Sequence, residues 1–255
     1  MNFLKVFAFG LMSLVLAAPV TAFAHGDEGR VAMEIDAAPV KAGSFEIEFE
    51  LVDLKEKKVI KEENLNVVHE KKLHAFIFDP ALKEFRHEHP EFINGKWLLR
   101  TDLQKNGNYF FWVQGEIASD QDEFFANSKI LIVNGDQENP MPPVLGNVRD
   151  GVDGVSKIQL SNQMIRAKKM VMLTLKFSRE DGSQPELSNY LGAKAHVIGV
   201  LEDGDTVIHV HPMDHGNLNE LMLHASFPVA GAYRLWVQFI DGGVLKTIPL
   251  SVIAQ

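Results

Sequence analysis

An internal repeat covers almost the whole chain and constrains its fold more than any other feature. His74 is followed thirteen residues later by a His-x-His-Pro motif that begins at His87. His196 is followed, at the same interval, by a second such motif that begins at His209. A repeat of this length corresponds to one structural unit that recurs along the chain. The sequence therefore predicts two copies of the same domain.

Matches away from the histidines extend the repeat toward both ends of the chain. Residues 107–114 match residues 231–238, and both segments end in Trp-Val-Gln. Between the copies, residues 135–143 combine three prolines with a glycine, a composition that interrupts regular structure. We therefore expect a first repeat at residues 25–135, a linker at 136–150 and a second repeat at 151–255.

Alternation of apolar and polar residues within each copy indicates β-strands. Residues 45–51 alternate with a period of two, and residues 170–177 show a similar pattern. Turn-forming pairs such as Asp203-Gly204 lie at hairpin-like spacing, and no long stretch has the helical period. The expected fold class is all-β, with two tandem immunoglobulin-like β-sandwich domains of about seven strands each.

The first 24 residues have the pattern of a cleavable signal peptide. Lys5 precedes an apolar run at residues 6–18, and the segment ends in Ala-Phe-Ala. This run is too short to cross a bilayer comfortably, and no later segment approaches the roughly 20 apolar residues that a transmembrane helix needs. We expect a signal peptide at residues 1–24, a periplasmic or secreted protein, and no membrane span after cleavage.

Charge and cysteine content exclude several classes of function. The formal net charge of −9 becomes −10 when Lys5 is removed, so the mature chain lacks the basic field that nucleic-acid binding requires. The chain contains no cysteine. Disulfides, thiolate metal sites and blue-copper centres are therefore excluded.

The repeated histidines are expected to converge in space. If the loop between two paired strands has an even number of residues, the first histidine lies opposite the last one and all three share a face. Opposed β-carbons lie about 5 Å apart, which lets three imidazoles reach one ion at about 2 Å from each nitrogen. The two predicted clusters are His74, His87 and His89 in the first copy and His196, His209 and His211 in the second.

Neutral imidazoles without cysteine suit copper or zinc better than calcium or magnesium, which prefer oxygen ligands. His215 follows the second motif and is a candidate fourth ligand. His69 and His224 have no counterpart in the other copy, and we interpret them as structural. Because imidazole must be neutral to bind a metal, we expect metal affinity to fall as the pH drops from about 7 to 5.

Three segments carry a resemblance to a known group of proteins: residues 191–196, 209–212 and 231–239. With this pattern the chain resembles secreted bacterial proteins with immunoglobulin-like domains, related to YtkA-like and copper-resistance-type periplasmic β-sandwiches. The resemblance implies metal handling and a metal-handling partner protein in the periplasm or the membrane. The first copy departs from the pattern at residues 70–73, which implies that the two sites differ in affinity.

The function we expect is that of a periplasmic metal-binding protein that buffers, carries or senses copper or zinc through a three-histidine cluster in each repeat. The alternative is an extracytoplasmic protein-interaction module in which the histidines only stabilise the fold. Three histidines and a water can also form a catalytic zinc site. However, no general base stands at a suitable spacing, and the chain has no nucleophile elbow, P-loop or zinc-protease motif, so we expect no enzyme.

Overall fold

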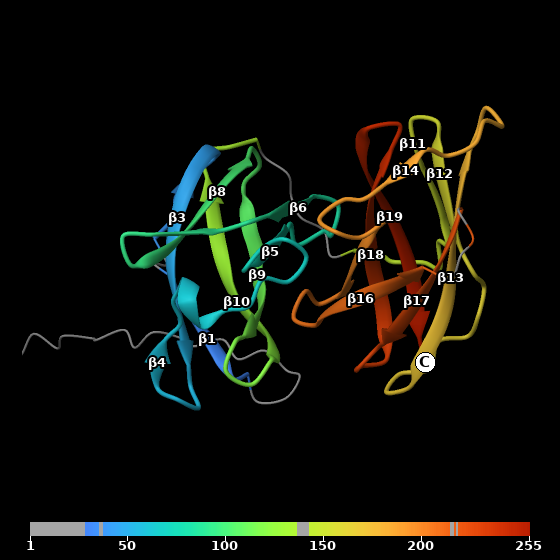
Figure 1. Ribbon diagram of the computed structural model, residues 1–255. Coiled ribbons are helices and arrows are strands. Elements are labelled where there is room, and N and C mark those ends of the chain that lie inside the picture. The colour runs from blue at the N-terminus through green and yellow to red at the C-terminus, as the bar shows by residue number, and fades with distance from the viewer. Residues whose placement is uncertain (1–28, 36–37, 137–142, 215–216, 218) are drawn as a thin grey trace, which may run out of the picture.

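The computed structural model describes residues 29–35, 38–136, 143–214, 217 and 219–255. Strands account for most of this part of the chain, and they form two bodies (Figure 1). The first body contains β1 (Val31–Ile35), β2 (Val40–Lys41), β3 (Gly43–Asp53), β4 (Lys58–Val59), a short 3-10 helix η1 (Glu62–Asn64), β5 (His74–Phe78), β6 (Phe85–Glu88), β7 (Glu91–Ile93), β8 (Lys96–Leu103), β9 (Gly107–Ile117) and β10 (Asp122–Val133).

The first body is a sandwich of two sheets. One sheet has the strand order β1-β3-β8-β7, with β4 paired to β3, and the other has the order β2-β10-β9-β5-β6. The short strand β2 joins β10 in parallel, whereas the other pairs in both sheets are antiparallel. This is the A-B-E-D and G-F-C-C′ arrangement of an immunoglobulin-type sandwich.

The second body repeats the central strand pairings of this arrangement but differs from the first body in several others. Its strands are β11 (Asp150–Asp153), β12 (Ser156–Leu160), β13 (Met170–Arg179), β14 (Leu187–Ser188), β15 (His196–Leu201), β16 (Val207–Asp214), β17 (Glu220–Ser226), β18 (Gly231–Asp241) and β19 (Val244–Ala254). Strand β16 first pairs with β15 and then, from His211 onward, with β17. It therefore joins the two sheets, whereas the first copy divides the corresponding segment into β6 and β7.

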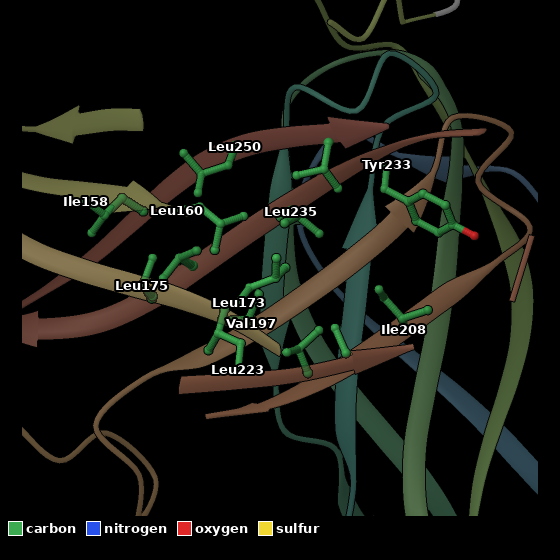
Figure 2. Close-up of a cluster of buried hydrophobic side chains, with 14 of the residues drawn as sticks. Ile158, Leu160, Leu173, Leu175, Val197, Ile208, Leu223, Tyr233, Leu235 and Leu250 are labelled. Carbon is green, nitrogen blue, oxygen red and sulfur yellow. The ribbon is translucent and has the colours of Figure 1, made fainter. Parts of the chain in front are cut away.

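Each sandwich has its own apolar core, because alternate residues of its strands point inward. In the second body, Leu173 and Leu175 of β13 and Leu223 of β17 pack against Val197 and Leu235 of the opposite sheet (Figure 2). The first body has an equivalent core around Phe49, Tyr109 and Phe111. Full burial of one such side chain stabilises the fold by about 1.5–3 kcal/mol. The prediction of an all-β chain with two tandem sandwiches is confirmed.

A third apolar cluster joins the two sandwiches. Its buried members are Phe76, Phe78, Leu82, Phe110 and Trp112 from the first body and Ile198, Val200 and Trp236 from the second. The indole Nε1 of Trp112 donates to the carbonyl oxygen of Gly204 at 3.2 Å, and Nε of Arg234 donates to the carbonyl oxygen of Leu82 at 3.1 Å. Strand β9 of the first domain thus contacts the loop between β15 and β16 of the second domain. The equivalent strand of the second domain, β18, contacts the loop between β5 and β6 of the first. The packing approximates a twofold relation between the copies.

Some sequence predictions fall outside what the structure tests. The predicted signal peptide at residues 1–24 lies outside the described residues, and the boundaries of the predicted linker remain a prediction. Within the described ranges, the structure contains no helix of the length and apolar character that crossing a membrane would need.

Candidate metal centre

The pairing of β5 with β6 brings the first three histidines to one side of the sheet. Ala75 pairs with Glu88 and Phe76 pairs with His87, so His74 stands opposite His89. The loop between the strands contains six residues, the even number that the sequence argument required. Because Ala75 belongs to the first core, His74 and Phe76 point to the opposite face, toward the second sandwich.

His74, His87 and His89 form a compact cluster there. One ring nitrogen from each lies within 4.8 Å of the others, and among the described residues only these three form a group of this kind. The Nδ1 atom of His74 lies 3.0 Å from Nε2 of His87. The ring centroid of His89 lies 5.1 Å from that of His74 and 4.9 Å from that of His87. The structure thus brings together the three predicted histidines of the first copy.

Hydrogen bonds to the outer nitrogens determine which inner nitrogens carry lone pairs. His74 donates from Nε2 to the carbonyl oxygen of Val68 at 3.0 Å, and His87 donates from Nδ1 to Oε1 of Gln238 at 2.7 Å. Gln238 is oriented for this role because its Nε2 donates to Oγ1 of Thr247. In the neutral rings, Nδ1 of His74 and Nε2 of His87 are then both acceptors, and they face each other at 3.0 Å.

Two facing acceptors repel each other unless a cation lies close to both. The Nε2 atom of His89 adds a third unsatisfied position, because it is buried and has no hydrogen-bond partner among the described residues. Buried polar atoms are normally paired, and an unpaired group where several donors converge is typical of a position that binds an ion or a water. Outer-nitrogen hydrogen bonds of this kind also orient histidines that bind metals. The cluster therefore has the donor set and the tautomers of a metal site.

The same turn precedes the buried histidine in both copies. Val68 and Lys71 form a backbone bridge across a two-residue turn, and so do Tyr190 and Ala193. The carbonyl oxygen of Tyr190 accepts a hydrogen bond from Nε2 of His196 at 2.9 Å, as that of Val68 does for His74. Both copies therefore bind the turn through Nε2 of the buried histidine.

Burial keeps the cluster uncharged at neutral pH. Desolvation lowers the pKa of His74 to about 4 and that of His89 to about 4. Desolvation also lowers the pKa of His87 well below its usual value, and the charges of the neighbouring histidines lower it further. Neutral imidazole is the form that binds metals, so these rings can bind an ion at neutral pH without first losing protons.

The sequence predicted a second cluster at His196, His209 and His211, and of these three side chains the structure describes that of His196 alone. His196 is buried on β15, and its ring centroid lies 6.5 Å from that of His74 and 6.1 Å from that of His87. The reason is the packing of the two sandwiches, which places β15 against the first domain. His196 therefore lies beside the first cluster.

The structure describes only the backbone of His209 and His211, two of the remaining ligands predicted for the second copy. Val197 pairs with Val210 and Ile198 pairs with His209, which is the predicted register and places His211 opposite His196. The side chains of His209 and His211 lie outside the described part of the structure, and His215 lies outside it altogether. Their role as ligands remains a prediction.

Two residues near the cluster were not predicted to lie there. The ring centroid of His69, which we interpreted as structural, lies 4.9 Å from that of His196 and 6.2 Å from that of His74. Gln238 was seen only as part of a repeated Trp-Val-Gln segment. That repetition was the available signal, since the glutamine pairs in register with the buried histidine of its own copy, Gln114 with His74 and Gln238 with His196.

Comparisons with known proteins add little about function. A family model described as a domain of unknown function (DUF8832) matches residues 150–255. No curated protein matches the chain. Resemblance to YtkA-like and copper-resistance-type proteins therefore remains a prediction.

Three of the solved structures that match this chain are distant from it in sequence. The fibronectin(III)-like modules of CbhA from Clostridium thermocellum are 13% identical, with a TM-score of 0.23 over 88% of this chain and 94% of that one. The titin domains z1z2, solved in complex with telethonin, are 9% identical, with a TM-score of 0.21 over 88% of this chain and 96% of that one. InvD of Yersinia pseudotuberculosis is 12% identical, with a TM-score of 0.27 over 88% of this chain and 57% of that one.

Proposed function

We propose that this chain is an extracytoplasmic metal-binding protein that holds a copper or zinc ion at His74, His87 and His89. The observation that carries the proposal is the pair of acceptor nitrogens, Nδ1 of His74 and Nε2 of His87, which face each other at 3.0 Å. A divalent ion that accepts both lone pairs removes their repulsion. The buried Nε2 of His89 supplies a third ligand for the same ion.

The donor set favours copper or zinc. Imidazole nitrogens suit Cu(II) and Zn(II), whereas the magnesium and calcium sites of proteins are built from oxygen ligands. Among the side chains that the structure describes, His196 is the nearest imidazole contributed by the other domain, and Gln238 of that domain already orients His87. An ion at this position would therefore be sensitive to how the two domains pack.

The biological role that fits this site is the buffering, carriage or sensing of metal outside the cytoplasm. Its support is the predicted signal peptide at residues 1–24, together with the absence of cysteine from the chain. A partner that delivers or receives the ion, in the periplasm or the membrane, is part of the proposal.

The test is calorimetric titration of the mature protein, residues 25–255, with Zn(II) and with Cu(II) at pH 7.5. We expect His87→Ala to lower the affinity at least tenfold, because it removes one of three ligands. Val155→Ala, at an exposed position outside the cluster, should leave it unchanged. Gln238→Leu should weaken binding by about 10- to 100-fold through loss of the outer hydrogen bond. Gln238→Glu keeps an oxygen acceptor and should restore most of the affinity.

Two results would overturn the proposal. The first is a wild-type protein that binds neither ion. The second is binding that His74→Ala and His87→Ala leave unchanged while circular dichroism shows both variants folded. Either result would favour the alternative function, an extracytoplasmic interaction module with structural histidines.

A further inference from the structure

One face of the second sandwich carries an unusual group of methionines. In β13 and β17, Leu173, Leu175, Leu221 and Leu223 point into the core, so the residues that alternate with them point outward. Those outward residues include Met170 and Met172 of β13, which are 67% and 48% exposed. Met222 of β17 lies on the same face, and its partner in β16 is Met213, which is 44% exposed. Four of the nine methionines of the chain therefore share one sheet face.

Register brings three of these thioethers next to an imidazole. Met172 pairs with His224, and Met213 pairs with Met222. Opposed side chains have β-carbons about 5 Å apart, and neighbours at a diagonal lie about 7 Å apart. The Nε2 atom of His224 is buried and has no hydrogen-bond partner among the described residues. Met172 and Met222 are thus neighbours of His224, and Met213 lies beside Met222 on the next strand of the same face.

The first copy shows what an ordinary solvent face looks like at the same place. At the offset of 124 residues that aligns the two copies here, Glu46 and Glu48 correspond to Met170 and Met172. In the first copy these glutamates form ion pairs, Glu46 with Arg100 at 2.7 Å and Glu48 with Lys96 at 3.8 Å. The fold therefore does not require methionine on this face. Exposed apolar side chains gathered in one patch commonly mark a binding site.

We infer that Met172, Met213, Met222 and His224 form a second metal site, which binds monovalent copper. Thioether sulfur is a soft ligand that favours Cu(I) over Zn(II) and Cu(II). This site lies on the outer face of the β13-β17-β16 sheet, while the histidine cluster lies between the domains. The inference does not rest on the proposed function, because none of these four side chains belongs to that cluster.

The test uses Ag(I), a monovalent soft ion that undergoes no redox change, with the full mature protein labelled at the methionine methyl carbons. We expect the methyl resonances of Met172, Met213 and Met222 to shift on titration with one equivalent of Ag(I). The resonance of Met164, which is 66% exposed in a different segment, should remain in place. Single leucine variants assign the resonances, because Met-to-Leu exchange roughly preserves the side-chain volume.

Affinity for Cu(I) is then measured under anaerobic, reducing conditions against a chromophoric Cu(I) chelator. The double variant Met172→Leu/Met222→Leu should lose at least tenfold in Cu(I) affinity, whereas Met164→Leu should match the wild type. Zn(II) binding should be unaffected by the double variant, so failure here is distinguishable from failure of the histidine site. Unshifted methyl resonances, or a double variant that binds Cu(I) as the wild type does, would overturn the inference and leave a protein-docking face as the explanation.

Discussion

At the scale of single residues, the decisive feature is the direction of lone pairs. The carbonyl oxygen of Val68 and the side chain of Gln238 each take the outer N–H of one histidine. These two contacts leave the inner nitrogens of His74 and His87 as acceptors facing each other. Because the two outer partners come from different domains, the tautomer of His87 depends on contact with the second sandwich.

Burial of these rings also makes the metal-free protein sensitive to acid. The pKa of His74 is about 4 in the folded state, below the value near 6.5 expected in the unfolded chain. Between these two values the unfolded state binds more protons, so stability is complete above about pH 6.5 and is lost as the pH falls toward 4. One ring with this shift accounts for about 2 kcal/mol between pH 7.5 and 4.5.

Urea denaturation of the chelator-treated protein at pH 7.5, 6 and 4.5 measures this loss, and His74→Asn/His89→Asn should flatten the pH dependence. A wild-type stability that does not change over this range would contradict the burial of neutral rings. Protons compete with metal only near the pKa of the folded state. We therefore expect metal affinity to fall below about pH 5, and not between about pH 7 and 5 as the unperturbed pKa suggested.

At the scale of elements, two short turns hold the histidines in place. In the turn between Val68 and Lys71, both His69 and Glu70 have positive φ, 49° and 65°. The equivalent turn of the second copy has Leu191 and Gly192, with φ of 48° and 77°. Positive φ is strained for residues with a β-carbon but not for glycine. The first copy therefore retains strain that the second copy partly avoids.

We predict that Glu70→Gly stabilises the protein by about 0.5–1 kcal/mol, since relief of about 1–2 kcal/mol of strain exceeds the entropic cost of glycine. The matched change Gly192→Ala should destabilise it by a similar amount. Free energies of unfolding from urea titrations measure both. Destabilisation by Glu70→Gly would show instead that the Glu70 side chain, which lies against Gly192, contributes more to the domain contact than the strain costs.

Strand β16 is the element of the second domain that connects the region beside the histidine cluster with the face that carries the methionines. It pairs with β15 beside the domain contact and then with β17 on the methionine face. A single strand therefore connects the sheet that holds His196 with the face that holds Met213. In the first copy, the break at His89 and Pro90 separates the corresponding strands β6 and β7.

At the scale of the whole molecule, the two sandwiches behave as the halves of a pseudo-symmetric pair. Trp236 stacks on Phe85 of the other domain with ring centroids 4.6 Å apart and planes at 11°. It is 2% exposed and lies among the residues of the shared apolar cluster. The domain contact is therefore built like a small core, with the histidine cluster beside it.

We predict that Trp236→Ala costs about 3–5 kcal/mol, partly by separating the domains. Small-angle X-ray scattering should show a larger radius of gyration for this variant without metal, and Zn(II) should reduce the difference because His87 and Gln238 meet across the contact. Val155→Ala, a change at an exposed position, is the control. An unchanged radius of gyration with and without Zn(II) would show that the contact does not depend on Trp236.

The sequence by itself determined the local features of this protein. Alternating residues such as those at 45–51 predicted strands, and the identical thirteen-residue spacing predicted the duplication. An even-numbered loop between the two strands predicted the register that places His74 opposite His89, because side chains in a strand alternate with a fixed period of two. These properties depend on neighbours along the chain and across one hairpin.

Only the tertiary structure decided how the copies face each other. Apolar residues such as Phe76 and Trp236 lie outside the cores of the two sandwiches and form one cluster between the domains. That packing places His196 and Gln238 of one domain beside His87 of the other, from positions more than a hundred residues apart. A repeat pattern predicts which residues of each domain point outward. Which of these outward faces pack together depends on the complementary shapes and apolar areas of both folded domains. The residue spacing within one copy does not determine that packing.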